Sequence, residues 1–340
     1  MQNINISDVY LPEGRRIGTA ENREYTSSEE GLMRAAASGK ILEGIAVLCD
    51  AGMNLSVDLG SCVACIPAKE TLYVPQGEEI KSIAVLTRVG KAVCFKVLSV
   101  GRSPAGKLTA VLSRRAAQID FMNNCMPALA AGDIIDAKVT HLEHFGAFAD
   151  IGCGIISLLA IDCISVSRIS HPKDRFYTGQ NIKAVIKAID RRSGRVTLSQ
   201  RELFGTWREN AALFEVGQTV AGIVRSVEYY GVFIELMPNL AGLAEYQDEL
   251  RPGVTAAVYI KSIIEERMKI KLAVVDAHSV LGITDKNKLH YFIEESETHI
   301  DYWRYSPRCC PKVIETNFMQ SDDTENEAMM VEMCNFSQTI

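Results

Sequence analysis

The sequence predicts an all-β protein built from tandem five-stranded closed barrels that are joined by short α-helical linkers. A segment of about twenty residues recurs at a fixed offset of 85 positions. Both copies alternate apolar and polar residues with period two, which is typical of half-buried antiparallel strands. The middle copy contains five strand-like runs in about seventy residues. Because five strands cannot leave both sheet edges unpaired without cost, a small closed barrel is favoured.

The repeat is visible in two stretches of sequence. Residues 131–151 read AGDIIDAKVTHLEHFGAFADI, and residues 216–236 read VGQTVAGIVRSVEYYGVFIEL. The pairs that match at the common offset are Gly132 and Gly217, Phe145 and Tyr230, Gly146 and Gly231, and Phe148 and Phe233. One offset across four positions indicates a true internal repeat.

Further strand-like runs follow each copy. In the middle copy they are residues 155–161, 181–190 and 194–199, and in the last copy residues 256–264 and 268–273. A fainter first copy, residues 39–60, aligns with residues 132–152 if one extra residue is allowed near the turn. In this copy Met53 and Ser56 stand where the others have aromatic residues.

These runs divide the chain into successive segments. We expect an N-terminal segment with a short helix (1–37), a divergent barrel (38–117), a helical linker (118–130), a second barrel (131–201), a second helical linker (202–215), a third barrel (216–275), a C-terminal segment with a hairpin (276–320) and an acidic tail (321–340). Pro127 and Gly205 threaten the continuity of the two linkers. Ser27 with Glu30 resembles a capping box that opens a helix through Ala37. The hairpin is predicted within residues 289–305, around residues 294–297.

Composition places the chain among ordinary globular proteins. Its 340 residues are 47% hydrophobic and 23% charged, which disfavours wholesale disorder and fibrous classes. The longest nearly apolar run, residues 153–161, is too short to span a bilayer. The polar N-terminus shows no targeting segment, so a cytoplasmic protein with ten reduced cysteines is expected.

The negative charge is concentrated at the C-terminus. The formal net charge is −6, and residues 321–340 hold five acidic residues and no basic one, which leaves −1 for the rest. The acidic balance therefore does not exclude a nucleic-acid partner.

Several segments of the middle repeat resemble a known family. The run from Gly132 through Val139, the FGAF segment at residues 145–148, a short third strand and the GRVTLS segment at residues 194–199 resemble the S1 RNA-binding domain, an OB-fold barrel. The match is specific in the middle repeat, good in the last and weak in the first. Together the repeats resemble the short bacterial homologues of 30S ribosomal protein S1, or a free-standing protein built from the same domains.

Binding of RNA requires particular side chains on the protein surface. Single-stranded RNA exposes base faces and phosphates, so its partner needs solvent-facing aromatic rings with cations beside them. Phe145 and Phe148 lie three residues apart, a spacing that points two rings to opposite faces of a regular strand. Presenting both rings to one ligand requires a twist or a bulge, which Gly146 permits. The basic residues expected beside them are Lys138, Lys187, Arg192 and Arg195.

The resemblance implies specific RNA-binding positions in the middle repeat. The family's RNA-facing aromatic pair falls on Phe145 and Phe148, and its later acidic and basic positions fall on Asp190 and Arg195. The histidine that the family carries in its third strand falls on Ala160, so this copy lacks it.

In the last repeat the resemblance implies a similar set. Tyr230 and Phe233 match the aromatic pair, and Glu265 and Lys269 match the acidic and basic positions. Glu245 stands where histidine is usual, and its charge would repel phosphate.

Each of these aromatic positions also has a purely structural interpretation. An aromatic residue in a strand is often part of the core, which is the alternative for Phe148 and Phe233. Met53 and Ser56 favour a structural or protein-contact role for the first barrel.

Two other clusters invite a metal or catalytic interpretation. Cys62 and Cys65 have a zinc-like spacing without a convincing second pair, and buried thiols are expected. His141, Glu143 and His144 are expected to be split between the two faces of their strand, which favours a solvated surface over a metal site.

The sequence contains no catalytic motif that we recognise, so we expect no enzyme activity, no cofactor and no metal. The first hypothesis is a non-catalytic binder of single-stranded RNA, expected to be mRNA, which acts in translation with the small ribosomal subunit and contacts it through the first barrel. A second hypothesis is an accessory protein of RNA decay or regulation. A third hypothesis is a protein-interaction scaffold of degenerate barrels. This hypothesis is supported by the first barrel, Glu245 and the acidic tail.

Overall fold

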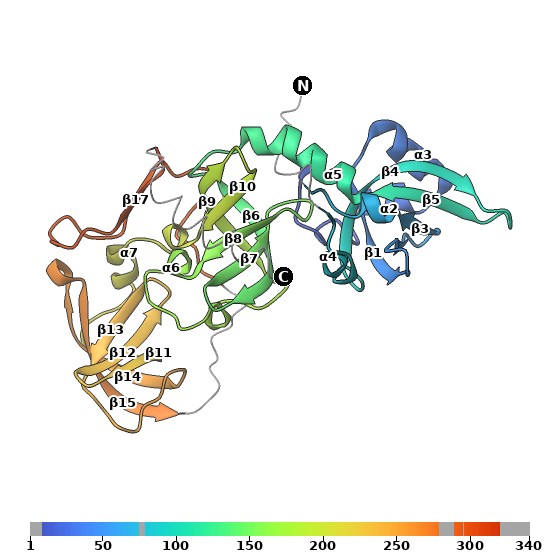
Figure 1. The fold of residues 1–340 in the computed structure, drawn as a ribbon. Helices are drawn as coiled ribbons and strands as arrows, with labels where there is room; N and C mark the ends of the chain where they lie inside the picture. The colour runs from blue at the N-terminus through green and yellow to red at the C-terminus, as the bar shows by residue number, and fades with distance from the viewer. Residues whose placement is uncertain (1–8, 75–78, 279–288, 295, 320–340) are drawn as a thin grey trace.

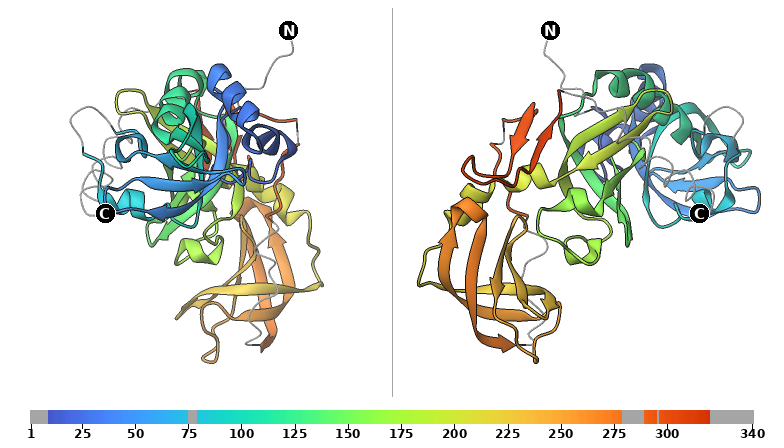
Figure 2. Two further views of the ribbon diagram at one scale, coloured as in Figure 1. Left: turned by 90° about the vertical axis from the view of Figure 1, so that its right-hand side faces the viewer. Right: turned by 60° about the vertical axis from the view of Figure 1, so that its left-hand side comes forward.

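The computed structural model describes residues 9–74, 79–278, 289–294 and 296–319. Within these residues the chain forms three closed five-stranded barrels and one two-stranded sheet. The barrels follow one another in a bent row, with the middle barrel at the bend (Figure 1, Figure 2). The predicted fold class, tandem five-stranded OB-type barrels with short helical linkers, is therefore confirmed.

The fifteen barrel strands fall into three groups of five. The first barrel consists of β1 (Leu42–Cys49), β2 (Leu55–Asp58), β3 (Val63–Ile66), β4 (Ala92–Arg102) and β5 (Leu108–Ser113). The middle barrel consists of β6 (Ile134–Glu143), β7 (Gly146–Asp150), β8 (Ile156–Ala160), β9 (Asn181–Asp190) and β10 (Arg195–Ser199). The last barrel consists of β11 (Thr219–Glu228), β12 (Gly231–Met237), β13 (Leu240–Ala244), β14 (Thr255–Ile264) and β15 (Lys269–His278).

All three barrels share one topology. The first strand pairs antiparallel with the second and with the fourth. The third strand pairs in parallel with the fifth, which closes the sheet. The first strand of each barrel also contains a β-bulge, at Val47, Thr140 and Arg225. A bulge bends and twists its strand, which helps a small sheet to close on itself.

Helical turns join the barrels. The first linker begins as α5 (Arg114–Asp120) and continues through the π turn η2 (Phe121–Cys125) and the 3-10 turn η3 (Met126–Ala128). The second linker consists of η5 (Arg201–Phe204) and α7 (Trp207–Ala211). Gly205 separates them with φ 75° and ψ 174°, a conformation that favours glycine, so the predicted interruption is found.

The N-terminal helices begin differently from the prediction. Two helices, α2 (Ala20–Thr26) and α3 (Glu29–Ser38), precede β1. Ser27 ends the first helix, and Ser28 caps the second by accepting a hydrogen bond from the Gly31 amide. The predicted start at Ser27 is therefore wrong by one residue, because Ser27 belongs to the end of a helix that was not expected.

A buried charge cluster joins the first two barrels. Glu13 lies in the segment before α2, and its carboxylate accepts a 2.6 Å hydrogen bond from Arg114 Nε and a 3.1 Å bond from the Cys94 amide. The Glu13 amide donates to Asp150 of the middle barrel at 2.7 Å. Burial by itself would raise the pKa of Glu13, but the Arg114 guanidinium outweighs burial, so the pKa lies below its ordinary value.

A second buried cluster joins the middle and last barrels. Arg175, just after η4 (Pro172–Asp174), donates to both carboxylate oxygens of Glu235 in β12 at 2.6 Å. Arg225 donates to the same carboxylate at 2.8 Å. The Asn239 side chain accepts from the Val166 amide at 2.9 Å and donates to the Gly205 carbonyl at 3.0 Å. These contacts set the position of one barrel against the other.

The C-terminal segment packs on the barrels. Tyr291 accepts a 3.0 Å hydrogen bond from the Lys183 amide, and the His299 ring contacts Asp133 at 2.6 Å. The two-stranded sheet pairs β16 (Tyr302–Arg304) with β17 (Glu315–Asn317). The hairpin predicted around residues 294–297 is therefore wrong: strand pairing starts later, where Trp303 and Tyr305 are buried against the last barrel.

Short helical turns complete the described part of the chain. They are η1 (Ala68–Glu70), α4 (Ser82–Leu86), α6 (Ile161–Ile164) and η6 (Glu265–Arg267). Among the described residues, every helix is too short or too polar to cross a membrane. The predicted acidic tail and the first eight residues lie outside the described residues.

We predict that Glu13→Ala destabilises the protein by about 3–5 kcal/mol, because it leaves the buried Arg114 guanidinium without its carboxylate partner. Urea unfolding followed by circular dichroism measures the change. The matched control is Glu24→Ala, which removes an exposed 3.1 Å pair with Arg34 and should cost less than about 1 kcal/mol. Equal small losses in the two variants would contradict a structural role for the cluster.

Candidate nucleic-acid interface

Two phenylalanine rings lie together on the outside of the middle barrel. Their centroids are 6.0 Å apart and their planes meet at 88°. In β7 the neighbours of Phe148, Ala147 and Ala149, are fully buried, whereas Phe148 and Phe145 are partly exposed. Both rings lie outside the hydrophobic core of this barrel. The alternative prediction, that Phe148 is a core residue, is therefore wrong.

The backbone explains how rings three residues apart share one surface. Phe145 is not in a strand but in the two-residue turn between β6 and β7, and only Phe148 is a strand residue. The bulge lies in the partner strand, at Thr140, instead of at Gly146. Gly146 serves another purpose, because a Cβ atom there would lie 2.6 Å from the Leu159 carbonyl oxygen. Close approach of β8, and not a local bulge, is what requires glycine.

Histidine rings extend this aromatic surface. His141 stacks on Phe148 with centroids 6.4 Å apart and planes at 27°. His144 meets Phe145 edge to face at 5.2 Å and 89°. His141 also contacts Glu143 at 2.6 Å, as a spacing of two residues in one strand predicts, whereas His144 lies in the turn and not in the strand. Both histidines are exposed, as a solvated surface requires.

The last barrel repeats the arrangement. The rings of Tyr230 and Phe233 are 6.1 Å apart and meet at 86°. Tyr230 again lies in the turn and Phe233 in β12, between the buried residues Val232 and Ile234. Tyr229 adds a further ring 5.0 Å from Tyr230. The two barrels thus present the same perpendicular pair of rings to solvent.

The predicted basic residues of the middle barrel have different surroundings. Lys138 donates to the Glu13 carbonyl at 2.8 Å, which places it at the junction with the N-terminal segment. Lys187 Nζ lies 3.6 Å from the Cys163 sulfur. Arg192 is exposed in the turn between β9 and β10, and Arg195 begins β10 directly opposite Asp190. The structure therefore brings Arg192, Arg195 and Asp190 together and holds Lys138 elsewhere.

Asp190 organises the turn that carries these arginines. Its carboxylate accepts hydrogen bonds from the Arg192 amide at 2.9 Å and from the Ser193 hydroxyl. The Ser193 hydrogen bond is the main cause that lowers the pKa of Asp190. Asp190 is therefore ionised at neutral pH and fixes the backbone between the two basic side chains.

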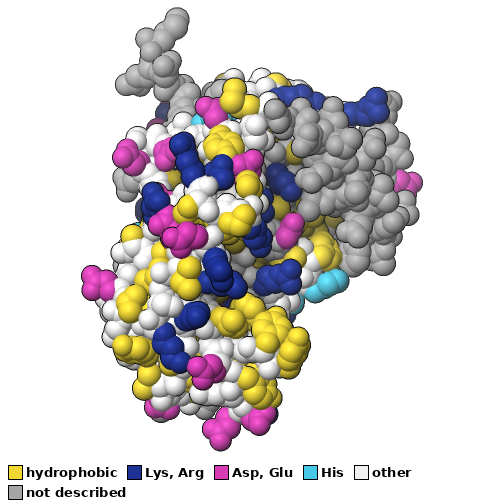
Figure 3. Space-filling view, turned by 90° about the vertical axis from the view of Figure 1, so that its left-hand side faces the viewer, with side chains coloured by type: hydrophobic (Ala, Val, Ile, Leu, Met, Phe, Trp, Pro, Cys, Tyr) yellow, Lys and Arg dark blue, Asp and Glu magenta, His cyan; other side chains and the backbone are white. Residues whose placement is uncertain are grey.

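The charges of the last barrel are partly balanced. Glu245, expected to repel phosphate, forms a 2.9 Å ion pair with Lys261, and the Lys261 hydrogen bond lowers the pKa of Glu245. Glu265 pairs with Arg208. Lys269 is exposed at the start of β15, opposite Ile264 in the register. Figure 3 shows several basic side chains along this side of the molecule, with acidic and hydrophobic side chains among them.

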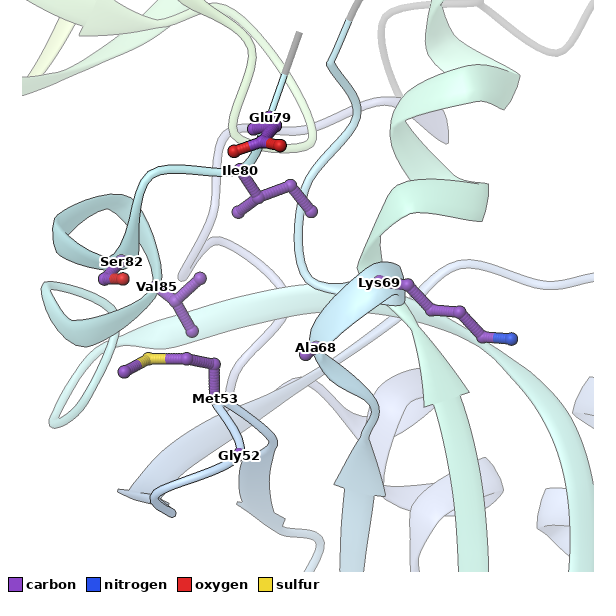
Figure 4. A pocket seen from close by; sticks show the side chains of 8 residues that line it. All are labelled: Gly52, Met53, Ala68, Lys69, Glu79, Ile80, Ser82 and Val85. Carbon is purple, nitrogen blue, oxygen red and sulfur yellow. The ribbon is translucent and has the colours of Figure 1, made fainter. Parts of the chain in front are cut away.

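The first barrel lacks the ring pair and carries apolar side chains instead. Met53 lines a pocket of about 330 Å³ together with Ile80 and Val85, while the Lys69 side chain points away from it (Figure 4). Ser56 stands in β2, where the other barrels have phenylalanine.

The register aligns a row of outward side chains across this barrel. Ser56 has Leu48 of β1 on one side and Cys65 of β3 on the other, and Cys65 is opposite Val111 of β5. Cys65 is exposed and Cys62 is partly exposed, so the expectation that both thiols are buried is wrong. The alternation of β3 turns Cys65 outward. Among the described residues, no group of three or more histidine, cysteine or acidic side chains could hold a metal ion.

Part of the chain matches a known domain family. Residues 128–201, which contain the middle barrel, match the S1 RNA binding domain family. The resemblance predicted for this repeat is therefore confirmed, and the other two barrels share its topology.

Two curated bacterial proteins illustrate the wider similarity. The chain is 29% identical over 194 residues to the small ribosomal subunit protein bS1 homolog of Bacillus subtilis, covering 56% of this chain and 49% of that protein. It is 31% identical over 180 residues to the small ribosomal subunit protein bS1 of Staphylococcus aureus strain COL, covering 48% and 46%. The chain spans about half the length of these curated relatives.

Among solved structures, the chain is similar to a multidomain protein with nucleic acid binding domains from Streptococcus pneumoniae. The identity is 13% and the TM-score 0.23, over 70% of this chain and 74% of that one.

We predict that Gly146→Ala destabilises the middle barrel by about 1–3 kcal/mol, because the new methyl group would push against the β8 backbone. Thermal unfolding measures the loss. The control is Gly101→Ala in β4, where a Cβ atom would meet nothing within 4 Å. An unchanged unfolding temperature for Gly146→Ala would show that close strand approach does not shape the turn.

Proposed function

We propose that this chain binds single-stranded RNA, without catalysing a reaction on it, through the aromatic surfaces of the middle and last barrels. The observation that carries the proposal is the repeated pair of half-exposed perpendicular rings, Phe145 with Phe148 and Tyr230 with Phe233. The family match of residues 128–201 supports RNA as the ligand.

The geometry favours unpaired bases. A base can lie flat on a solvent-facing ring only if its own face is free, which excludes bases inside a duplex. Two rings at right angles hold neighbouring bases in different orientations, so the strand must be flexible enough to turn them apart. Arg192 in the β9–β10 turn and Arg195 at the start of β10 would provide cations for the phosphates.

The free energy of stacking per base indicates that tight RNA binding needs more than one barrel. Stacking contributes ~1–3 kcal/mol per base, so two ring pairs give roughly micromolar affinity after ordering costs are deducted. One barrel by itself should bind weakly. Because buried contacts such as Arg175 with Glu235 hold the two barrels in one arrangement, a strand bound to one barrel meets the other at a high effective concentration.

The process we propose is translation in the cytoplasm. The bacterial relatives are named as proteins of the small ribosomal subunit. For this chain we propose that the RNA is messenger RNA and that the first barrel contacts the small subunit. The exposed apolar row of that barrel, which includes Leu48 and Val111, suits a protein contact better than a nucleic-acid contact. An accessory role in RNA decay remains the alternative process.

We predict that the double substitution Phe145→Ala, Phe148→Ala weakens binding of an unstructured oligonucleotide at least about tenfold, because two stacking surfaces are lost. Fluorescence anisotropy over a salt titration measures the affinity, which should fall with rising salt in both proteins. Both rings are partly exposed, so circular dichroism should show the fold retained.

The matched control for that experiment is Tyr177→Ala, which removes another exposed ring of the middle barrel and should leave the affinity unchanged. Unchanged affinity after the double substitution would favour the protein scaffold over the RNA-binding protein.

We predict that Leu48→Glu with Val63→Glu abolishes co-sedimentation with small ribosomal subunits and leaves oligonucleotide binding intact. Both side chains are more than half exposed, at 53% and 60%, so the barrel should still fold. Leu213→Glu, in an equally exposed residue next to the last barrel, is the control. If the full chain never sediments with small subunits, the decay or regulatory role is favoured.

A further inference from the structure

A third ring stands beside the aromatic pair in both RNA-facing barrels. Tyr229 of the last barrel is 89% exposed, and its ring lies 5.0 Å from Tyr230 at 89°. His144 of the middle barrel is also exposed and lies 5.2 Å from Phe145 at the same angle. In each barrel this residue is the first of the two turn residues between the first and second strands.

Neither packing nor the fold explains why these rings are exposed at the same turn position in two barrels. A tyrosine that remains so exposed gains almost nothing from the hydrophobic effect when the protein folds. A single exposed ring would need no explanation. Here, however, the ring recurs at the same turn position in two barrels, and each time it continues the row of the two stacking rings.

We propose that Tyr229 and His144 are third stacking platforms, so that each of these barrels holds three consecutive bases of the strand instead of two. The inference rests on the proposed RNA binding and deepens it. The row Tyr229, Tyr230 and Phe233 turns by close to a right angle at each step. Each ring therefore accepts a separate base that is unstacked from its neighbours.

The two third platforms differ in strength. Tyr229 presents a large ring with a hydroxyl group, and stacking grows with ring area. His144 presents the smaller imidazole ring. We therefore expect the last barrel to depend more on its third ring than the middle barrel does.

The test measures the last barrel within the full chain. In a protein that carries Phe145→Ala and Phe148→Ala, the further change Tyr229→Ala should weaken binding of a short unstructured oligouridine about tenfold, which is within the range for loss of one stacked base. The matched control is Tyr259→Ala, in a tyrosine of β14 that is 41% exposed and pairs with Thr219, at the opposite end of β11 from the turn that carries Tyr229. The control should leave the affinity unchanged.

A second variant gives a direct readout of stacking. The chain has two tryptophans, Trp207 and Trp303, and both are buried. In Tyr229→Trp the new indole is therefore the exposed fluorophore, and its emission should be quenched when the oligouridine binds, with affinity retained.

The outcomes separate the two proposals. If Tyr230→Ala weakens binding while Tyr229→Ala does not and the indole is not quenched, the third platform is refuted and the ring pair stands. If Tyr230→Ala also has no effect in the same background, RNA binding by the last barrel is refuted, and the third platform falls with it.

Discussion

Closure of each barrel is the constraint on which the rest of this structure depends. The first strand pairs with the second and the fourth, and the third strand pairs with the fifth, so every strand has two neighbours. Alternate side chains then fill the small interior, which is why Ala147 and Ala149 are fully buried. The position between them must face outward. Phe148 and Phe233 reach solvent because the alternation of their strands places them on the outer face.

The barrels are joined by buried charges and not only by covalent linkers. Glu13 holds Arg114 at the first junction, and Glu235 holds Arg175 and Arg225 at the second. Loss of one partner from such a cluster leaves a desolvated charge and typically costs about 3–5 kcal/mol. The relative positions of the aromatic surfaces are therefore part of the folded structure. On the proposed function, a long flexible RNA strand would meet the two aromatic surfaces in a set geometry, which is the basis of the avidity that we propose.

Much of the candidate site could be predicted from sequence, because it follows from local patterns. The offset of 85 positions located both ring pairs, and the turn between β9 and β10 was visible at Arg192. The surroundings of Lys138 were not predictable, since its partner Glu13 is 125 residues away in sequence. The pairing of Glu245 with Lys261 likewise depends on how two strands align. Tyr229 and His144 were present in the aligned stretches, but only their ring geometry distinguishes them from ordinary turn residues.

The division between sequence and tertiary structure follows the range of the interactions. Strand periodicity, the internal repeat and the turn residues are local, so the amino-acid order is enough to predict three barrels and to locate the repeated aromatic positions. The contacts between barrels and the burial of Trp303 in the sheet of β16 and β17 depend on long-range packing. Whether Phe145 and Phe148 share one surface was likewise decided in three dimensions, because it depends on a bulge in one strand, a turn, and the close approach of a third strand to Gly146.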